Sequence, residues 1–512
     1  MENVATQSLL RVWVGYLALC VGMFMAILDI QIVASSLPTI QHALGIATSE
    51  LSWIQTSYLI AEIVAIPLTG WLTRLLSVRW LFVTAITGFT LASIGCAASD
   101  TFMQLIGFRI LQGFCGGALI PIVFTSVFVM FPKRSQVLAT TIGGLLAMLA
   151  PTVGPVLGGY ITEHYSWHWL FLVNVLPGVV VAVAALLTVR IGAPDWSLWR
   201  KVDALSVLCV AICLASLELA LKEGPSNHWR GSYMLALMAA MLLTGVWAAR
   251  RCLNREDPLL DLTCFAQRRF AFGCIYSFVL GMGLFGSVYL MPLYLGFVRE
   301  HGALEIGKIM MVMGVAQLLS APVAAWAEKR FPARGLLLFG FTLYAAGLFT
   351  NADMTYATDY DELFWPQILR GVAVLFCLLP ATALALEGIA TARLSNASAL
   401  FNLMRNLGGA ISIALVDTMV EERQPIHVEH LTTQLKSGQL DVLRDIGFTG
   451  PTLPAEFSQA VAQASAPLIE RAALVHAFND TWMMLGVAFS LAVCLALFRV
   501  RTQPAESSAP LK

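Results

Sequence analysis

Three ionisable residues in the first half of the chain, Asp29, Glu62 and Arg109, lie inside long apolar segments. Placing an ionisable side chain in the centre of a bilayer costs about 2.5–3.5 kcal/mol on insertion scales, so such residues usually serve a function. Two carboxyl groups and a guanidinium group in this setting could bind and release protons. We therefore expect Asp29, Glu62 and Arg109 to take part in proton coupling.

Asp29 and Arg109 are expected at the same depth, because each lies about seven residues, roughly 10 Å, from the outer end of its apolar segment. A low dielectric favours the neutral form of a carboxyl group, whereas a nearby arginine favours the ionised form. A conformational change that separates the pair would therefore capture or release a proton. The alternative is a static buried ion pair that fixes the register of the helices.

Polar side chains form stripes along the same helices. Gln55, Tyr58 and Glu62 follow the i, i+3, i+7 spacing of one helix face, and Gln112 lies one turn after Arg109. In the second half, Arg370 and Arg405 lie inside apolar segments, and Arg405 shares a helix face with Ser398, Asn402, Gly409 and Ser412. These residues either line a substrate cavity or hold helices together through polar contacts. The candidates for the cavity are Gln55, Tyr58, Gln112, Asn402, Arg405 and Arg370.

Other chemistry has little support in the sequence. No Gly-rich Lys-Ser/Thr motif for phosphate occurs, so ATP-driven work is not expected. None of the eight histidines lies deep in an apolar segment, and the ten cysteines include no Cys-x-x-Cys pair, which argues against metal sites. The balance of 31 basic and 31 acidic residues argues against nucleic-acid binding. We expect no enzyme, no metal and no cofactor, with a proton gradient as the energy source.

The elements that position these residues are expected to be membrane-spanning helices. Hydrophobic residues make up 58% of the chain and charged residues 12%, whereas soluble domains have about a quarter charged residues. A helix needs about 20 residues to cross the hydrocarbon layer. The sequence predicts an all-α membrane protein with fourteen spans, at 13–37, 51–72, 80–98, 102–125, 137–160, 168–190, 203–221, 231–250, 270–296, 305–327, 335–351, 363–386, 397–420 and 478–499.

The basic residues between these spans predict the orientation. Most of them fall on the side that carries the N-terminus, and lysine and arginine accumulate on the cytoplasmic side of membrane proteins. Both termini are therefore expected in the cytoplasm. The one long connection, 422–476, then lies outside the membrane, where we expect a small external hairpin or cap.

An internal repeat predicts the domain organisation. The segment 67–79 recurs at 322–334, with a Pro, a Trp and an Arg at matching positions. Two related six-helix bundles are expected, in 1–190 and 266–512, and two inserted spans with cytoplasmic linkers in 191–265. Related halves with a substrate site at their interface are a common design of transporters.

The repeat also distinguishes the halves chemically. At its constant offset of 255 residues, Leu284 corresponds to Asp29, and Gln317 corresponds to Glu62. The buried carboxyl groups are therefore expected in the first half only.

Five segments of the sequence carry recognisable motifs. They are Leu28-Asp29 to Leu37-Pro38, Gly70-Trp-Leu-Thr-Arg74 with Arg79, Arg109-Ile-Leu-Gln112-Gly113, Gly154-Pro155-Val-Leu-Gly158-Gly159, and Trp167 to Gly178. Together they resemble the major facilitator superfamily, in its fourteen-span drug:proton antiporter branch of the EmrB/QacA type. The resemblance covers nearly the whole chain. Thr73 stands where the second motif usually has an acidic residue.

The resemblance implies a multi-pass transporter in the cytoplasmic (inner) membrane of a bacterium, which exports small amphipathic or lipophilic compounds by alternating access in exchange for protons. Such multidrug efflux gives antibiotic resistance. Asp29 and Arg109 match the family's proton-coupling residues, and Gly154 and Pro155 match the hinge associated with export. The other positions that we assign to conformational change are Gly158, Gly70, Arg74 and Arg79. By itself, Gly154-x-x-x-Gly158 is also typical of close helix packing.

The resemblance further implies the partners. We expect a small-molecule substrate, membrane lipid and, in a host with two membranes, a periplasmic adaptor protein and an outer-membrane channel. Two alternatives stay open: a dedicated exporter of one metabolite, such as a siderophore, lipid or toxin, and a non-transporting membrane receptor or scaffold. The presence of Asp29 and Arg109 argues against a scaffold, which has no need of buried charges.

Overall fold

The computed structural model describes residues 9–190, 194, 196, 203–224, 229–255, 260–387, 389, 391–437 and 459–497. Within these residues the secondary structure is helical, without a β-strand. Thirteen helices of the described chain are long and apolar enough to cross a membrane, and a shorter apolar helix covers Leu205–Leu221. The predicted all-α membrane fold is confirmed. The count of fourteen spans and the cytoplasmic position of the termini stay predictions.

The first half of the chain forms helices that follow the predicted spans closely. They are α1 (Leu9–Ala34), α2 (Leu37–Leu44), η1 (Thr48–Glu50), α3 (Trp53–Ala97), α4 (Phe102–Met130), α5 (Lys133–His164), α6 (Trp169–Leu172) and α7 (Val175–Thr188). The element α3 contains two spans, because its backbone leaves the helical region at Ser77, with φ 68° and ψ 159°. A positive φ at a residue other than glycine marks a local turn.

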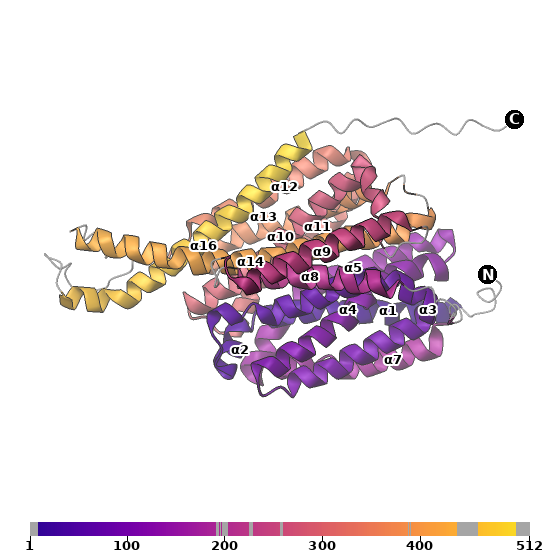
Figure 1. Ribbon diagram of the computed structural model, residues 1–512, viewed down its shortest axis with the longest axis horizontal. Helices are drawn as coiled ribbons and strands as arrows, with labels where there is room; N and C mark the ends of the chain where they lie inside the picture. Colours follow the sequence, from indigo (N-terminus) through magenta and orange to yellow (C-terminus); the bar gives the residue numbers. More distant parts are fainter. Residues whose placement is uncertain are drawn as a thin grey trace.

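The inserted pair and the second half follow in the same manner. Their elements are α8 (Ala204–Glu223), α9 (Ser232–Asn254), η3 (Leu262–Ala266), α10 (Arg268–Phe297), α11 (Ala303–Arg330), α12 (Ala333–Phe349), η4 (Thr350–Asp353), α13 (Tyr360–Leu386), α14 (Thr391–Lys436) and α16 (Gln459–Leu497). Most of the helices run roughly along the long axis of the molecule (Figure 1). The first-half helices gather on one side of the bundle and the second-half helices on the other. The helix α8 packs on α3 and α14, one from each half, and α9 packs on α8.

Two pairs of helices make most of the contact between the halves. The helix α5 packs along α11, and α3 packs along α14. The α5–α11 contact is close because glycines remove the side chains between the helices. A Cβ atom on Gly307 would lie 2.3 Å from the Pro155 carbonyl oxygen, and one on Gly159 would lie 2.1 Å from the Ala303 carbonyl oxygen. Small residues permit such an approach of two backbones inside a membrane.

The helices α14 and α16 extend beyond the other helices as a paired arm (Figure 1). The segment expected to form an external hairpin or cap, 422–476, is largely a continuation of these two helices, and 438–458 lies outside the described residues. The two helices of the arm pack through Leu431, Leu435, Ile469, Ala472 and Ala473. We call the end of the bundle with α2 and this arm the hairpin end.

Candidate functional site

Asp29 and Arg109 meet in the interior of the first half, where both side chains are 0% exposed. Arg109 Nη1 forms an ion pair with Asp29 Oδ2. The second carboxylate oxygen, Asp29 Oδ1, accepts hydrogen bonds from Gln112 Nε2 at 2.9 Å and from Asn174 Nδ2 at 2.8 Å. Three donors therefore surround the carboxylate, which is what a buried charge requires.

The arginine of this pair is held from three sides. Arg109 Nε donates to the Ile54 carbonyl oxygen at 2.9 Å, and Nη1 donates to Gln112 Oε1 at 2.8 Å. The guanidinium carbon lies 4.5 Å from the centre of the Tyr58 ring. A Cβ atom on Gly113 would lie 2.2 Å from the Tyr58 carbonyl oxygen, so this glycine lets α4 approach α3 and brings Arg109 to its partners. Arg109 Nη2 has no hydrogen-bond partner within the described chain.

Two residues of this network were missed in the sequence. Asn174, the residue that precedes α7, donates a hydrogen bond to Asp29. Ser93 Oγ accepts a hydrogen bond from Gln112 Nε2 at 2.8 Å. Asn174 lies in the Trp167–Gly178 segment that supported the family resemblance, and that motif could have indicated it. Ser93 has no such signal.

Glu62 lies where the two halves meet, on α3 facing α14. Its carboxyl group interacts with the Asn406 side chain and with the positive charge of Arg405. Arg405 Nη2 donates in turn to Asn402 Oδ1 at 2.7 Å. Glu62 is 2% exposed, and its Oε2 atom has no hydrogen-bond partner among the described residues. The stripes predicted separately on the two halves are therefore parts of one polar site.

Tyr58 connects this central site with the Asp29–Arg109 pair. It lies one helical turn before Glu62, its ring covers Arg109, and its hydroxyl donates to the Ala26 carbonyl oxygen at 3.2 Å. Gln55 lies on the same face one turn before Tyr58 and is 2% exposed. Its Nε2 atom has no hydrogen-bond partner in the described part of the chain.

Arg370 lies apart from the other predicted cavity residues. It is 1% exposed, and its guanidinium carbon lies 4.8 Å from the centre of the Trp482 ring. Arg370 Nη2 donates to Gln367 Oε1 at 2.9 Å, and Nε donates to the Pro366 carbonyl oxygen at 3.3 Å. No carboxylate of the described residues forms an ion pair with it. The structure therefore places Arg370 in the packing of the second half.

The predicted hinge residues of α5 lie at a junction of three helices. A Cβ atom on Gly158 would lie 2.1 Å from the Ile32 carbonyl oxygen, and one on Gly154 would lie 2.6 Å from Gln31 Cβ. The segment around Pro155 thus packs on α1 as well as on α11. The glycines are required for this packing, and their role as a hinge stays a prediction.

The loop motif between the second and third spans is less constrained. Around an added Cβ atom on Gly70, no described atom lies within 4 Å. The Arg79 guanidinium carbon lies 5.4 Å from the centre of the Trp80 ring, and Arg79 Nε has no hydrogen-bond partner among the described residues. The side chain of Arg74 lies outside the described part of the structure.

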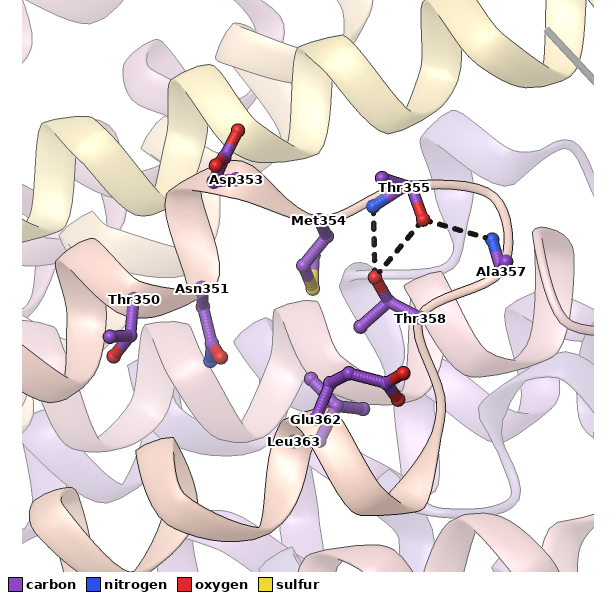
Figure 2. A pocket seen from close by; sticks show the side chains of 9 residues that line it. All are labelled: Thr350, Asn351, Asp353, Met354, Thr355, Ala357, Thr358, Glu362 and Leu363. Carbon is purple, nitrogen blue, oxygen red and sulfur yellow. Dashed lines mark hydrogen bonds between the residues drawn. The ribbon is translucent and has the colours of Figure 1, made fainter. Parts of the chain in front are cut away.

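A separate cavity of about 330 Å³ lies at the hairpin end, between η4 and the start of α13 (Figure 2). The hydroxyl groups of Thr355 and Thr358 approach to 3.3 Å on one side of it. Its lining consists of Thr350, Asn351, Asp353, Met354, Thr355, Ala357, Thr358, Glu362 and Leu363, and includes none of the predicted site residues.

The sequence matches the family model of the Major Facilitator Superfamily over residues 19–413. Among curated proteins, the chain is 34% identical to the colistin resistance protein EmrB of Acinetobacter baumannii, with 96% of each chain covered. It is 29% identical to the multidrug export protein EmrB of Escherichia coli over 92% of each chain. It is 28% identical to the fatty acid resistance protein FarB of Neisseria gonorrhoeae, over 82% of this chain and 83% of that protein.

The fold is also similar to those of solved transporters. A bacterial homologue of the human lysosomal transporter Spinster, in an inward-facing and unoccupied conformation, matches with a TM-score of 0.62 at 13% identity, over 98% of this chain and 100% of the other. A POT family transporter in complex with 5-aminolevulinic acid matches with a TM-score of 0.63 at 12% identity, over 94% and 95% of the two chains. At such low identity these matches indicate a shared fold only.

Proposed function

The chain belongs to the major facilitator superfamily, within the group of the EmrB proteins, and from this premise we propose that it exports amphipathic or lipophilic compounds in exchange for protons. It is a multi-pass membrane transporter, and alternating access between the two halves would carry the substrate across. The observation that carries the proposal is the buried Asp29–Arg109 pair, which Tyr58 connects to Glu62 and Arg405 at the interface of the halves.

The geometry supports a proton-dependent change at Asp29. Protonation of its carboxylate would remove the Coulomb attraction to Arg109, while Gln112 and Asn174 could still hydrogen bond to the neutral group. Arg109 would then lose its counter-ion in a region from which water is excluded. A buried charge without a partner is strongly unfavourable, so the helices that carry the two residues, α1 and α4, would rearrange.

Glu62 and Arg405 support a substrate site between the halves. Glu62 offers an acceptor oxygen without a partner in the described chain, and Arg405 offers a positive charge from the opposite helix. A compound with a polar head and an apolar body could hydrogen bond there and lie along the surrounding apolar side chains. The names of the relatives, which refer to colistin, to multiple drugs and to fatty acids, support this class of substrate.

We also propose the location and the larger assembly. The EmrB relatives come from bacteria with two membranes, which supports the inner membrane as the site of action. A periplasmic adaptor protein and an outer-membrane channel would continue the path of the exported compound. The arm of α14 and α16 projects from the hairpin end, where an adaptor could reach it (Figure 1).

The test is substrate-driven proton release from proteoliposomes. Purified protein is reconstituted with an acidic interior and a fluorescent pH probe, cationic and lipophilic drugs are added, and proton efflux is recorded. We expect efflux in the wild type and none in Asp29→Asn. Asp100→Asn, which removes an exposed carboxylate at the start of α4, is the matched control and should behave as the wild type. Full activity of Asp29→Asn would refute the assigned role of Asp29.

A further inference from the structure

Asp417 connects the two halves of the transporter at the hairpin end. It lies on α14 and accepts hydrogen bonds on both carboxylate oxygens. Ser52, at the start of α3 in the first half, donates its hydroxyl to Asp417 Oδ2. Tyr289, on α10 in the second half, donates its hydroxyl to Asp417 Oδ1 at 2.8 Å. Both donors are buried, and Asp417 itself is partly buried.

The same two helices meet again at the central site. Along α3, Ser52 precedes Glu62 by 10 residues, about 15 Å at the helical rise. Along α14, Asp417 follows Asn406 by 11 residues, about 17 Å. The helices therefore run antiparallel across the interface, with one polar contact at the Glu62 site and a second at the hairpin end. A movement that opens the hairpin end must separate Ser52 from Asp417.

Other contacts between the halves at this end are of a different kind. The helices α5 and α11 touch through glycines such as Gly159, and a Cβ atom on Gly296 of α10 would lie 2.5 Å from Cγ of Pro38 in α2. Those contacts are close but uncharged. The hydrogen bond to Asp417 has an ionisable acceptor, and hydrogen bonds to a carboxylate are stronger than those between neutral groups.

We propose that Asp417 is a positioning residue that latches the hairpin end shut: it holds α3 of the first half against α14 through Ser52, and Tyr289 fixes the orientation of its carboxylate. This inference rests on the proposed function, because a latch between the halves has a purpose only in alternating access. Opening toward the hairpin end breaks the Ser52 contact, while the Tyr289 contact within the second half keeps Asp417 in place for closure.

The test measures opening of the hairpin end directly. Ala414, three residues before Asp417 and 2% exposed, is replaced by cysteine in the full-length protein, and the exposed Cys494 is replaced by serine. In right-side-out vesicles a membrane-impermeant maleimide then reacts with the reporter cysteine only when the hairpin end opens. Labelling of the parent protein without the reporter is subtracted.

We expect Asp417→Asn to raise the labelling rate about tenfold, a typical size for a shift of a conformational equilibrium. Ser52→Ala, which removes the same hydrogen bond from the opposite half, should have a similar effect. Asp417→Glu should restore slow labelling in part. Glu421→Gln, which removes an exposed carboxylate one turn further along α14, is the matched control and should label as the wild type.

Unchanged labelling in both Asp417→Asn and Ser52→Ala would overturn the latch, even if the variants melt at a lower temperature. The assay needs neither substrate nor a proton gradient. A negative labelling result would therefore not affect the proton-efflux test of the proposed function, and a negative efflux result would not affect the labelling test.

Discussion

Two arginines at related positions of the two halves have opposite environments. The motif Arg109-Ile-Leu-Gln112-Gly113 in α4 has a counterpart in α13. There Gln367 stands at the position of Arg109, and Arg370 stands at the position of Gln112. Both arginines are buried, but Arg109 pairs with the Asp29 carboxylate, whereas Arg370 lies against the Trp482 ring and hydrogen bonds to neutral acceptors. The two related halves thus differ in their buried charges: the first contains the Asp29–Arg109 ion pair, and the second contains the cation Arg370 without a carboxylate partner among the described residues.

The difference decides which half can respond to protons. A carboxylate paired with an arginine has two states of protonation, and the energy of the pair depends on which of them is occupied. Arg370 has no carboxylate partner among the described residues, and an arginine does not lose its proton in proteins. We infer that the first half contains the proton-sensitive pair, and that Arg370 serves the packing of the second half through its contact with Trp482.

The largest expected effect comes from breaking the pair in the first half. Asp29→Asn leaves the buried charge of Arg109 without a counter-ion, so we expect the unfolding free energy to fall by about 3–5 kcal/mol. The measurement is denaturant-induced unfolding of the purified protein in detergent. The double variant Asp29→Asn with Arg109→Gln removes both charges and should recover part of the loss. Equal stability of the single and double variants would contradict this account.

The corresponding change in the second half should matter far less. Arg370→Gln removes a charge that has no carboxylate to leave behind, so we expect a change of about 1 kcal/mol or less in the unfolding free energy. Proton efflux driven by substrate should persist. If Arg370→Gln reduced stability or coupling as severely as Asp29→Asn, the contrast between the two arginines would be wrong.

The central site allows a test of how the halves cooperate. Glu62→Gln and Arg405→Gln each remove one charge of a facing pair, and we expect the double variant to show a coupling energy of about 0.5–3 kcal/mol in substrate binding. Binding is measured by fluorescence quenching with a drug that is transported by the wild type. Asn402→Ala, which removes the hydrogen-bond partner of Arg405, is a milder control. Additive effects of the two charge changes would mean that they act separately.

Much of this arrangement could be predicted from the sequence. The length of the apolar segments located most of the helix ends, because the thickness of the bilayer fixes the length of a span. The equal depth of Asp29 and Arg109 made an ion pair between them possible, and the structure shows that pair. The offset of the repeat placed Leu284 and Gln317 opposite Asp29 and Glu62, so the lack of carboxyl groups at those two positions could be read from the sequence.

Other features depend on lateral contacts that a single sequence does not reveal. The meeting of Glu62 with Arg405 and Asn406 is set by how α3 faces α14, and spacing along one helix carries no information about that angle. Asp417 lies near the end of its predicted span, where a carboxylate costs little, so it gave no signal. The arm was expected to be a small external hairpin or cap, but its length was not predicted: the structure shows two long paired helices, which pack through residues such as Leu435 and Ile469.

The smallest expected effect on stability concerns Asp359, a carboxylate at the hairpin end of the second half. Asp359, before α13, accepts hydrogen bonds from Arg299 at 2.6 Å and His301 at 2.9 Å. Partial burial disfavours the ionised form of Asp359, but the hydrogen bonds from Arg299 and His301 outweigh this and lower its pKa to about 2. The unfolded value is about 3.9, so the contact stabilises the protein above about pH 4, and the stabilisation is lost as the pH falls toward 2.

Asp359→Asn should therefore lower the Tm slightly at pH 7, and the difference from the wild type should vanish near pH 2. The effect is small because the Asp359 side chain is 34% exposed and water screens the interaction. Asp361→Asn, at an exposed position in the first turn of the same helix, is the matched control and should lower the Tm less than Asp359→Asn does. A difference in Tm that persisted unchanged to pH 2 would show that the carboxylate charge at this edge is unimportant. The contrast with Asp29 would then rest on burial alone.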